Sequence, residues 1–258
     1  MIKKKLLVCL GIGEHIEKTK QVFYSALNEG QWRDEMMLLT LKDQDDNKLK
    51  WFKDRNILIS QQERINHESD FFSILLTKFY LFTKEFKKWN KILYLDSDVI
   101  IRGNLNHICQ LEGDIYFASG GKDRTLEWDF KKPKTIKIEY DLSKAGFNAG
   151  VFWLDTKIIK KTSFKELMDL TKRFSDDIKI ISADQGILNL YFYDRWTPFP
   201  EKSVIQSSRR NVDLYLEETI YHFAGGTNPW EDKAPDHLRK IWEKNNMEAQ
   251  INMATKTI

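Results

Sequence analysis

The sequence Ile92-Leu93-Tyr94-Leu95-Asp96-Ser97-Asp98 joins a short apolar run to two aspartates that are separated by one residue. Four consecutive apolar residues are typical of a strand that is buried on both faces. In an extended chain, residues two apart project to the same side. We therefore predict that Asp96 and Asp98 present two carboxylates on one side, at the carboxyl end of a buried strand.

Two carboxylates in this position form half of a binding site for a hard divalent cation. Mg²⁺ and Mn²⁺ prefer oxygen ligands and often bridge a protein carboxylate to substrate phosphates. Ligands of open α/β sheets also bind beyond the carboxyl ends of the strands. The alternative is a solvated loop with two acids, because a D-x-D triplet also arises by chance. The apolar run before Asp96 favours the metal site.

The rest of the chain alternates between strand-like and helix-like segments, which predicts an α/β fold with crossover helices. The expected elements are strands at 6–12, 35–41, 56–60 and 91–95 and helices at 17–29, 70–86 and 235–246. No repeat or linker divides the sequence. We therefore predict one domain at 1–248, followed by a tail at 249–258 whose weak pattern is typical of disorder.

Composition excludes some classes of partner. Charged residues make up 31% of the chain but the net charge is only +3, so nucleic acid is not expected as the main partner. No apolar stretch reaches the roughly 20 residues of a membrane span. Residues 1–10 resemble a signal peptide, but Gly11 and Gly13 interrupt the run, which favours a first strand. Two isolated cysteines, Cys9 and Cys109, are typical of free thiols, so we expect a cytoplasmic protein.

Four segments, taken in order, resemble a known family. They are LYLDSD at 93–98, FNAGV at 147–151, DQGILN at 184–189 and HFAGGTNPW at 222–230. Together they resemble the retaining glycosyltransferases of family 8, which include glycogenin and bacterial lipopolysaccharide galactosyltransferases. The resemblance implies a single GT-A domain, which is a Rossmann-like mixed sheet flanked by helices. It also implies a UDP-sugar donor, a Mn²⁺ ion with Mg²⁺ as the alternative, and a homodimer.

The resemblance also assigns the residues of the site. The implied metal ligands are Asp96, Asp98 and His222, and an imidazole among oxygen ligands shifts preference from Mg²⁺ towards Mn²⁺. The implied catalytic residues are Asp184, Gln185 and Lys78. The residues implied to contact the donor are Leu10, Gly11, Ile12, His15, Lys78, Ser97, Asp123, Asn148, Ala149, Gly150, Gly225 and Asn228.

Three of these residues have other interpretations. Lys78 interrupts a strongly apolar run, so it either extends to the surface or serves a buried anion. His222 alone fits a hydrogen-bonded histidine at a strand end. Asp184 also suits the first turn of a helix, where the macrodipole favours an acid. The resemblance favours the functional interpretation for Lys78 and His222, whereas for Asp184 both interpretations can hold at once.

Asn228 departs from the family pattern, which places a lysine directly before Pro229-Trp230. A lysine would offset the charge of the departing diphosphate, whereas an asparagine can only donate hydrogen bonds. This departure leaves an alternative open, namely a UDP-sugar-binding pseudoenzyme that acts as a sensor or scaffold.

The main functional prediction is retaining transfer of a hexose, glucose or galactose, from a UDP-sugar to a glycan or protein acceptor. Gln185 is a poor nucleophile, so we favour front-side attack assisted by Asp184 over a covalent intermediate. A phosphatase with a D-x-D motif is disfavoured, because the pair lies in the middle of the chain. Ile100 also stands where that class has Thr or Val.

Overall fold

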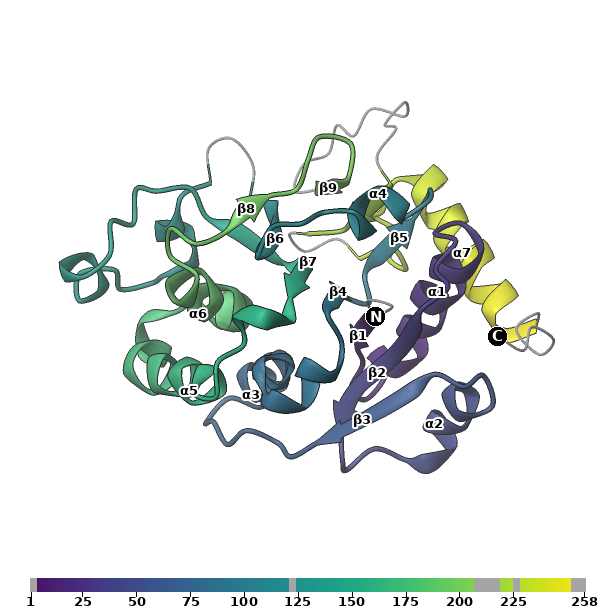
Figure 1. The fold of residues 1–258 in the computed structure, drawn as a ribbon, viewed down its shortest axis with the longest axis horizontal. Helices are drawn as coiled ribbons and strands as arrows, with labels where there is room; N and C mark the ends of the chain where they lie inside the picture. Colours follow the sequence, from purple (N-terminus) through teal and green to yellow (C-terminus); the bar gives the residue numbers. More distant parts are fainter. Residues whose placement is uncertain (1–3, 121–123, 207–218, 225–227, 252–258) are drawn as a thin grey trace.

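A seven-stranded sheet forms the centre of the computed structural model, which describes residues 4–120, 124–206, 219–224 and 228–251 (Figure 1). In spatial order the strands are β3 (Leu58–Gln62), β2 (Glu35–Leu41), β1 (Lys5–Leu10), β4 (Lys91–Leu95), β7 (Phe147–Asp155), β6 (Ile115–Ser119) and β8 (Thr197–Pro198). The first four run parallel, β7 is antiparallel to β4 and β6 is antiparallel to β7. The predicted mixed sheet is thus confirmed.

Helices cover both faces of this sheet (Figure 1). One face carries α1 (His15–Asn28), α2 (Asp46–Lys53) and α4 (Asn106–Cys109). The other carries α3 (Asp70–Leu76), α5 (Ser163–Phe174) and α6 (Ala183–Tyr191). The last helix, α7 (Asp236–Ile251), packs against α1.

The apolar run of β4 serves both faces at once. Ile92 and Tyr94 belong to the core beneath α3 and α6, and Leu93 and Leu95 belong to the core beneath α1. All four side chains are fully buried. A central strand that is covered on both sides has no solvent face, and this explains the unbroken apolar sequence.

A second, three-stranded sheet continues from the end of β4. It consists of β5 (Val99–Ile101), β10 (Ile220–His222) and β9 (Val204–Gln206). β10 is antiparallel to β5 and parallel to β9. Strands of three residues are too short to give a periodic pattern, so β5 and β9 were not predicted from the sequence.

The predicted long helix at 70–86 is wrong. The α-helix ends at Leu76, and two 3₁₀ segments follow at Thr77–Phe82 and Lys84–Lys88. Most side chains of Thr77–Phe82 are buried, among them Phe79 and Phe82, and Phe86 of the second segment is buried as well. The tighter turn aligns residues three apart and so directs Phe79 and Phe82 to the same core.

Two element boundaries also differ from the prediction. Asn56 has a φ of 54°, a left-handed conformation that asparagine tolerates, and β3 therefore begins only at Leu58. Helix α7 runs to Ile251, past the expected domain boundary at 248, and residues 252–258 lie outside the described residues. With 16 residues α7 is the longest described helix, and none of these helices is long and apolar enough to cross a membrane.

The aromatic core beneath α3 should dominate stability. Phe152 is fully buried and its ring lies 4.8 Å from that of Tyr94 and 5.3 Å from that of Phe117. We expect Phe152→Ala to lower the free energy of unfolding by about 3–5 kcal/mol, as measured by urea denaturation. Phe71→Ala is the control, because Phe71 is 50% exposed, and it should cost about 1 kcal/mol or less. Equal losses in both variants would contradict this account of the core.

Candidate functional site

Asp96 and Asp98 lie where the chain leaves the large sheet and enters the small one. The N–H of Asp96 donates to Gly150 O at 2.8 Å, and the Tyr94 hydroxyl donates to its carboxylate at 2.6 Å. The carbonyl of Asp98 accepts from the N–H of Phe223 at 3.1 Å. Hydrogen bonds from both sheets therefore hold the two aspartates in place.

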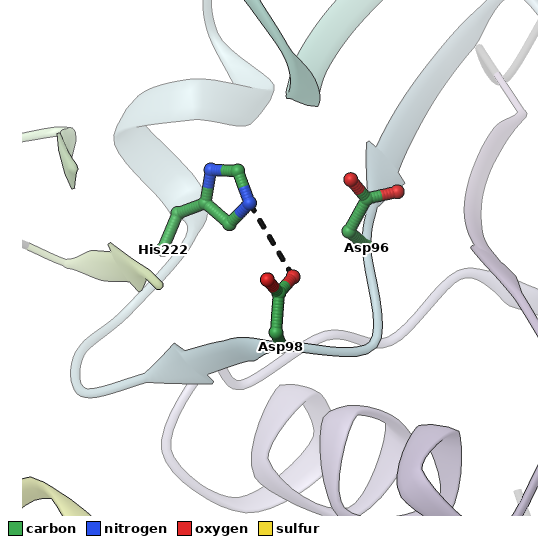
Figure 2. Close-up of side chains that lie close together, drawn as sticks. All are labelled: Asp96, Asp98 and His222. Atoms are coloured by element: carbon green, nitrogen blue, oxygen red, sulfur yellow. Dashed lines mark ion pairs between the residues drawn. The ribbon is translucent and has the colours of Figure 1, made fainter. Parts of the chain in front are cut away.

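Strand β10 brings His222 to the same point. In the antiparallel pair of β5 and β10, His222 stands opposite Val99, the residue after Asp98. Its Nε2 lies 3.3 Å from Asp98 Oδ1. Figure 2 shows the side chains of Asp96, Asp98 and His222 converging on one space. A single strand pairing thus joins segments that are far apart in the sequence.

The three side chains fit a divalent cation. One ligand atom from each of Asp96, Asp98 and His222 lies within 4.8 Å of the others. Ligands that are about 2.1 Å from one ion lie at most about 4.2 Å apart, so small side-chain rotations would complete the set. Two carboxylates and one imidazole suit Mn²⁺ and leave coordination positions for phosphate oxygens.

Gly150 forms one wall of this space. A Cβ at this position would lie 2.5 Å from His222 Nε2 and 2.7 Å from Asp96 Oδ2. Real Cβ atoms do not approach nitrogen or oxygen so closely, so any larger residue would displace the two ligands. The close packing of the predicted metal ligands therefore favours glycine here, besides the expected contact with a sugar.

Lys78 connects the predicted metal ligands to α6. Its side chain is only 2% exposed, which excludes the interpretation that it extends to the surface. Its ammonium donates to Ala149 O at 3.0 Å, forms an ion pair and hydrogen bond with Asp184, and lies 3.4 Å from Asp96 Oδ1. The ammonium is therefore paired with two carboxylates and one carbonyl.

The charged groups of this cluster shift one another's pKa values. Burial lowers the pKa of Lys78, but Asp184 and Asp96 outweigh it, so the net shift is upward and the ammonium stays charged. Burial raises the pKa of Asp96; Lys78 opposes this and Asp98 adds to it, and the net shift is again upward. Burial lowers the pKa of His222, but Asp98 and Asp96 raise it overall. The carboxylates thus attract positive charge to this point.

Residues Asp184 and Gln185 lie in the first turn of α6, and both are buried. The Gln185 side-chain carbonyl accepts from the N–H of Ala149 at 3.3 Å. The Asn148 side-chain carbonyl accepts from the N–H of Gly150 at 2.8 Å. The predicted donor-sugar residues of β7 and α6 therefore lie side by side, next to Lys78.

The residues at the end of β1 are largely engaged within the protein. The N–H of Gly11 donates to Leu39 O at 3.0 Å, and its carbonyl accepts from the Thr40 hydroxyl at 2.6 Å. A Cβ on Gly11 would lie 3.1 Å from the Cα of Ile16, so close packing of α1 explains this glycine. Leu10 ends β1, and the carbonyl of Ile12 accepts from the N–H of His15 at 3.1 Å.

One side chain beyond β1 reaches the residue between the two aspartates. His15 Nδ1 lies 3.2 Å from the Ser97 hydroxyl, between the two aspartates in the sequence. The His15 ring also lies 5.8 Å from the Trp230 ring, edge to face. His15 thus contacts Ser97 and Trp230, and the role of His15 and Ser97 in contacting a nucleotide stays a prediction.

Asn228 makes a hydrogen bond within its own loop. Its side-chain amide donates to Glu231 at 2.6 Å. Two other predicted donor contacts, Asp123 and Gly225, lie outside the described residues.

Sequence reasoning missed two residues that build the site. The Tyr94 hydroxyl holds Asp96, but in the sequence this tyrosine was only one apolar member of a strand. Asp129 is fully buried, and it accepts from the Gln185 side chain at 2.7 Å. Asp129 lies in a short 3₁₀ segment, Leu126–Asp129, and no motif marks it.

The wall formed by Gly150 gives a direct test of the cation site. We expect Gly150→Ala to weaken Mn²⁺ binding by about 10-fold or more, because the methyl group displaces His222 and Asp96. Mn²⁺ binding can be measured by electron paramagnetic resonance. Gly103→Ala is the matched control, because the nearest atom to its Cβ would be 3.9 Å away. Unchanged Mn²⁺ affinity in Gly150→Ala would contradict the assignment.

Among curated relatives, glycosyltransferase GlyF of Streptococcus pneumoniae is 26% identical over 176 residues, covering 64% of this chain and 40% of GlyF. Lipopolysaccharide 1,2-glucosyltransferase of Escherichia coli is 28% identical over 172 residues, covering 59% of this chain and 49% of that enzyme. The chain thus spans about half the length of the curated relatives it matches.

Solved structures share the fold. GlyE of Streptococcus pneumoniae superposes with a TM-score of 0.70 at 20% identity, over 97% of this chain and 63% of GlyE. The galactosyltransferase LgtC, solved with donor and acceptor sugar analogs, gives a TM-score of 0.70 at 15% identity, over 94% of this chain and 95% of LgtC. The fold of this chain is therefore the GT-A fold. The model of glycosyl transferase family 8 matches residues 18–234, most of the sequence, and the chain belongs to that family.

Proposed function

We propose that this chain is a retaining glycosyltransferase that transfers a hexose, glucose or galactose, from a UDP-sugar in the presence of Mn²⁺. The observation that carries the proposal is the position of Lys78, which bonds Asp96 of the triad and Asp184 of α6 at once. A cation site and a carboxylate for the sugar are thereby held at a fixed separation. Family membership, and a glucosyltransferase and a galactosyltransferase among similar proteins, support a hexose as the transferred group.

In this proposal Asp96, Asp98 and His222 hold the Mn²⁺ ion. Held by these residues, the ion would supply Lewis-acid stabilisation of the negative charge on the leaving diphosphate. The imidazole of His222 favours Mn²⁺ over Mg²⁺, because Mg²⁺ prefers an all-oxygen set.

The sugar is held by the first turn of α6 in this proposal. The Asp184 carboxylate is fixed by Lys78 and can bind a sugar hydroxyl or stabilise positive charge near the anomeric carbon. Gln185 carries a neutral amide, which is a poor nucleophile, so a covalent glycosyl intermediate on this residue is disfavoured. We therefore assign retention to front-side attack by the acceptor, on the face from which UDP departs.

A UDP-sugar-binding protein without turnover is the second candidate. The observation that favours it is the hydrogen bond of Asn228 to Glu231, at the place where the family pattern has a lysine. The intact group of Lys78, Asp184 and Gln185 favours the transferase, because a binding protein has no need of a carboxylate fixed beside the anomeric carbon.

The proposal extends to the rest of the chain as follows. Residues 1–248 form one GT-A domain, and the acceptor is a glycan or a protein that binds outside the donor pocket. Free thiols at Cys9 and Cys109 support a cytoplasmic location. A homodimer is proposed on family resemblance alone.

Nucleotide binding should depend on the metal. We expect UDP with Mn²⁺, at about 100 times its dissociation constant, to raise the melting temperature by about 5–10 °C, because ligand binds only the folded state. Chelation by EDTA or the variant Asp98→Asn should abolish the rise. Asp54→Asn, an exposed aspartate of α2, should keep it. A rise of equal size without a divalent ion would refute the metal-bridged mode of binding.

Turnover should depend on Asp184. We expect Asp184→Asn to lower kcat for UDP-sugar hydrolysis or transfer about 10²–10³-fold, because a carboxylate near developing positive charge is lost. Binding of UDP with Mn²⁺ should remain. Asp169→Asn on the surface of α5 is the control for the charge change. Wild-type protein that binds UDP-sugars but turns none of them over would favour the binding-protein candidate.

A further inference from the structure

Asp129 is a fully buried carboxylate close to α6, outside the predicted set of site residues. Its side chain has no exposed surface. Burial raises its pKa; Arg124 and Gln185 oppose the rise, and the net direction is upward. Burial of a carboxylate costs free energy unless several hydrogen-bond donors satisfy it. We therefore expect Asp129 to have such donors or a functional role that offsets this cost.

Several described side chains donate hydrogen bonds to the Asp129 carboxylate, Ser182 among them. Arg124 Nη2 and Gln185 Nε2 each donate to its Oδ1 at 2.7 Å, and Asn189 Nδ2 donates to its Oδ2 at 3.2 Å. Arg124 is partly exposed, so its charge balances the carboxylate at the edge of the core. Gln185 and Asn189 lie one turn apart on α6. Asp129 therefore binds one side of this helix directly.

The Gln185 amide can adopt only one orientation in this setting. Its carbonyl oxygen accepts from the N–H of Ala149, and its NH₂ group donates to Asp129. A flipped amide would place carbonyl against carboxylate and NH₂ against N–H, so two favourable contacts would become two repulsive ones. One N–H of Gln185 donates to Asp129, and among the described residues no other acceptor is found for this NH₂ group.

The Ala149 peptide carries this constraint to the rest of the site. Its N–H binds Gln185, and its carbonyl accepts from Lys78, which in turn binds Asp184. Every link is a hydrogen bond between buried groups. Displacement of the Gln185 amide would therefore free one side of the Ala149 peptide.

We propose that Asp129 is a positioning residue, which locks the Gln185 amide so that its remaining N–H faces the donor sugar. The inference rests on the proposed function for the identity of the sugar ligand, but the lock itself is a property of the free protein. Asp129 touches no reacting atom, and its effect passes through Gln185. Loss of the lock adds the cost of ordering the amide to sugar binding and leaves the triad that binds the diphosphate intact.

The lock is tested without ligand by nuclear magnetic resonance of the full chain. The Nε2 protons of Gln185 are identified by their loss in Gln185→Leu. In the wild type we expect two well-separated proton shifts, because one proton is bonded to a carboxylate. In Asp129→Ala the separation should collapse towards that of a solvent-exposed amide, and Asp129→Asn, which keeps one acceptor, should lie between. Unchanged Gln185 shifts in Asp129→Ala would overturn the proposal.

The functional arm compares two ligands on the same variants. We expect Asp129→Ala to bind UDP with Mn²⁺ within about 2-fold of the wild type and a UDP-hexose about 2–10-fold more weakly, the cost of ordering one side chain. Asp129→Asn should lose less. Equal weakening of UDP and UDP-hexose would mean general damage to the fold and would overturn the proposal.

Asp155→Asn provides the matched control. Asp155 is also a largely buried carboxylate, and it pairs with Lys91 at 3.1 Å where β4 begins and β7 ends. It should change neither the Gln185 shifts nor the ratio of the two affinities, even if it lowers the melting temperature. A wild type that binds neither UDP nor UDP-hexoses would refute the proposed function, and the Gln185 shifts would then still decide whether the lock exists.

Discussion

The buried ammonium of Lys78 is the interaction on which the arrangement of the site depends. It is surrounded by the carbonyl of Ala149 and the carboxylates of Asp96 and Asp184, and its position lies over the Tyr94 ring at 4.7 Å. A lysine without these partners could not remain charged in the core, and the carboxylates without the lysine would repel each other. The attraction between the buried ammonium and the two carboxylates thus stabilises the site.

The sequence predicted the central part of this site because its chemistry is local. Two aspartates after an apolar strand are visible as a pattern, and the strand end defines the side on which they project. The position of His222 followed only from resemblance, because its place depends on the three-residue pairing of β10 with β5. Asp129 could not be predicted at all, since its role arises from the packing of a 3₁₀ segment against α6.

The same distinction applies to the fold. Long strands and crossover helices gave clear periodic patterns, and the mixed sheet agrees with the expectation. The run from Thr77 to Lys88 did not, because its first half, Thr77–Phe82, is largely buried and has no polar face to mark its period. Its 3₁₀ geometry is set by the core that surrounds it, and this core also buries Lys78. The segment whose secondary structure was predicted wrongly therefore also contains Lys78, a predicted catalytic residue.

The charge balance of the site indicates that the diphosphate and the sugar are stabilised by different groups. The ammonium of Lys78 is already paired with Asp184 and Asp96, and the amide of Asn228, which donates to Glu231, carries no charge that could offset a diphosphate. Within the described residues, Lys18 lies near Trp230 but is directed at the rings of Trp230 and Trp242. In the proposed reaction, the negative charge of the departing UDP would therefore be offset mainly by the cation that Asp96, Asp98 and His222 hold. In the same proposal, Lys78 fixes the position of Asp184 beside the sugar. Charge compensation at the diphosphate and placement of the sugar therefore depend on different groups, and both remain possible with asparagine at position 228.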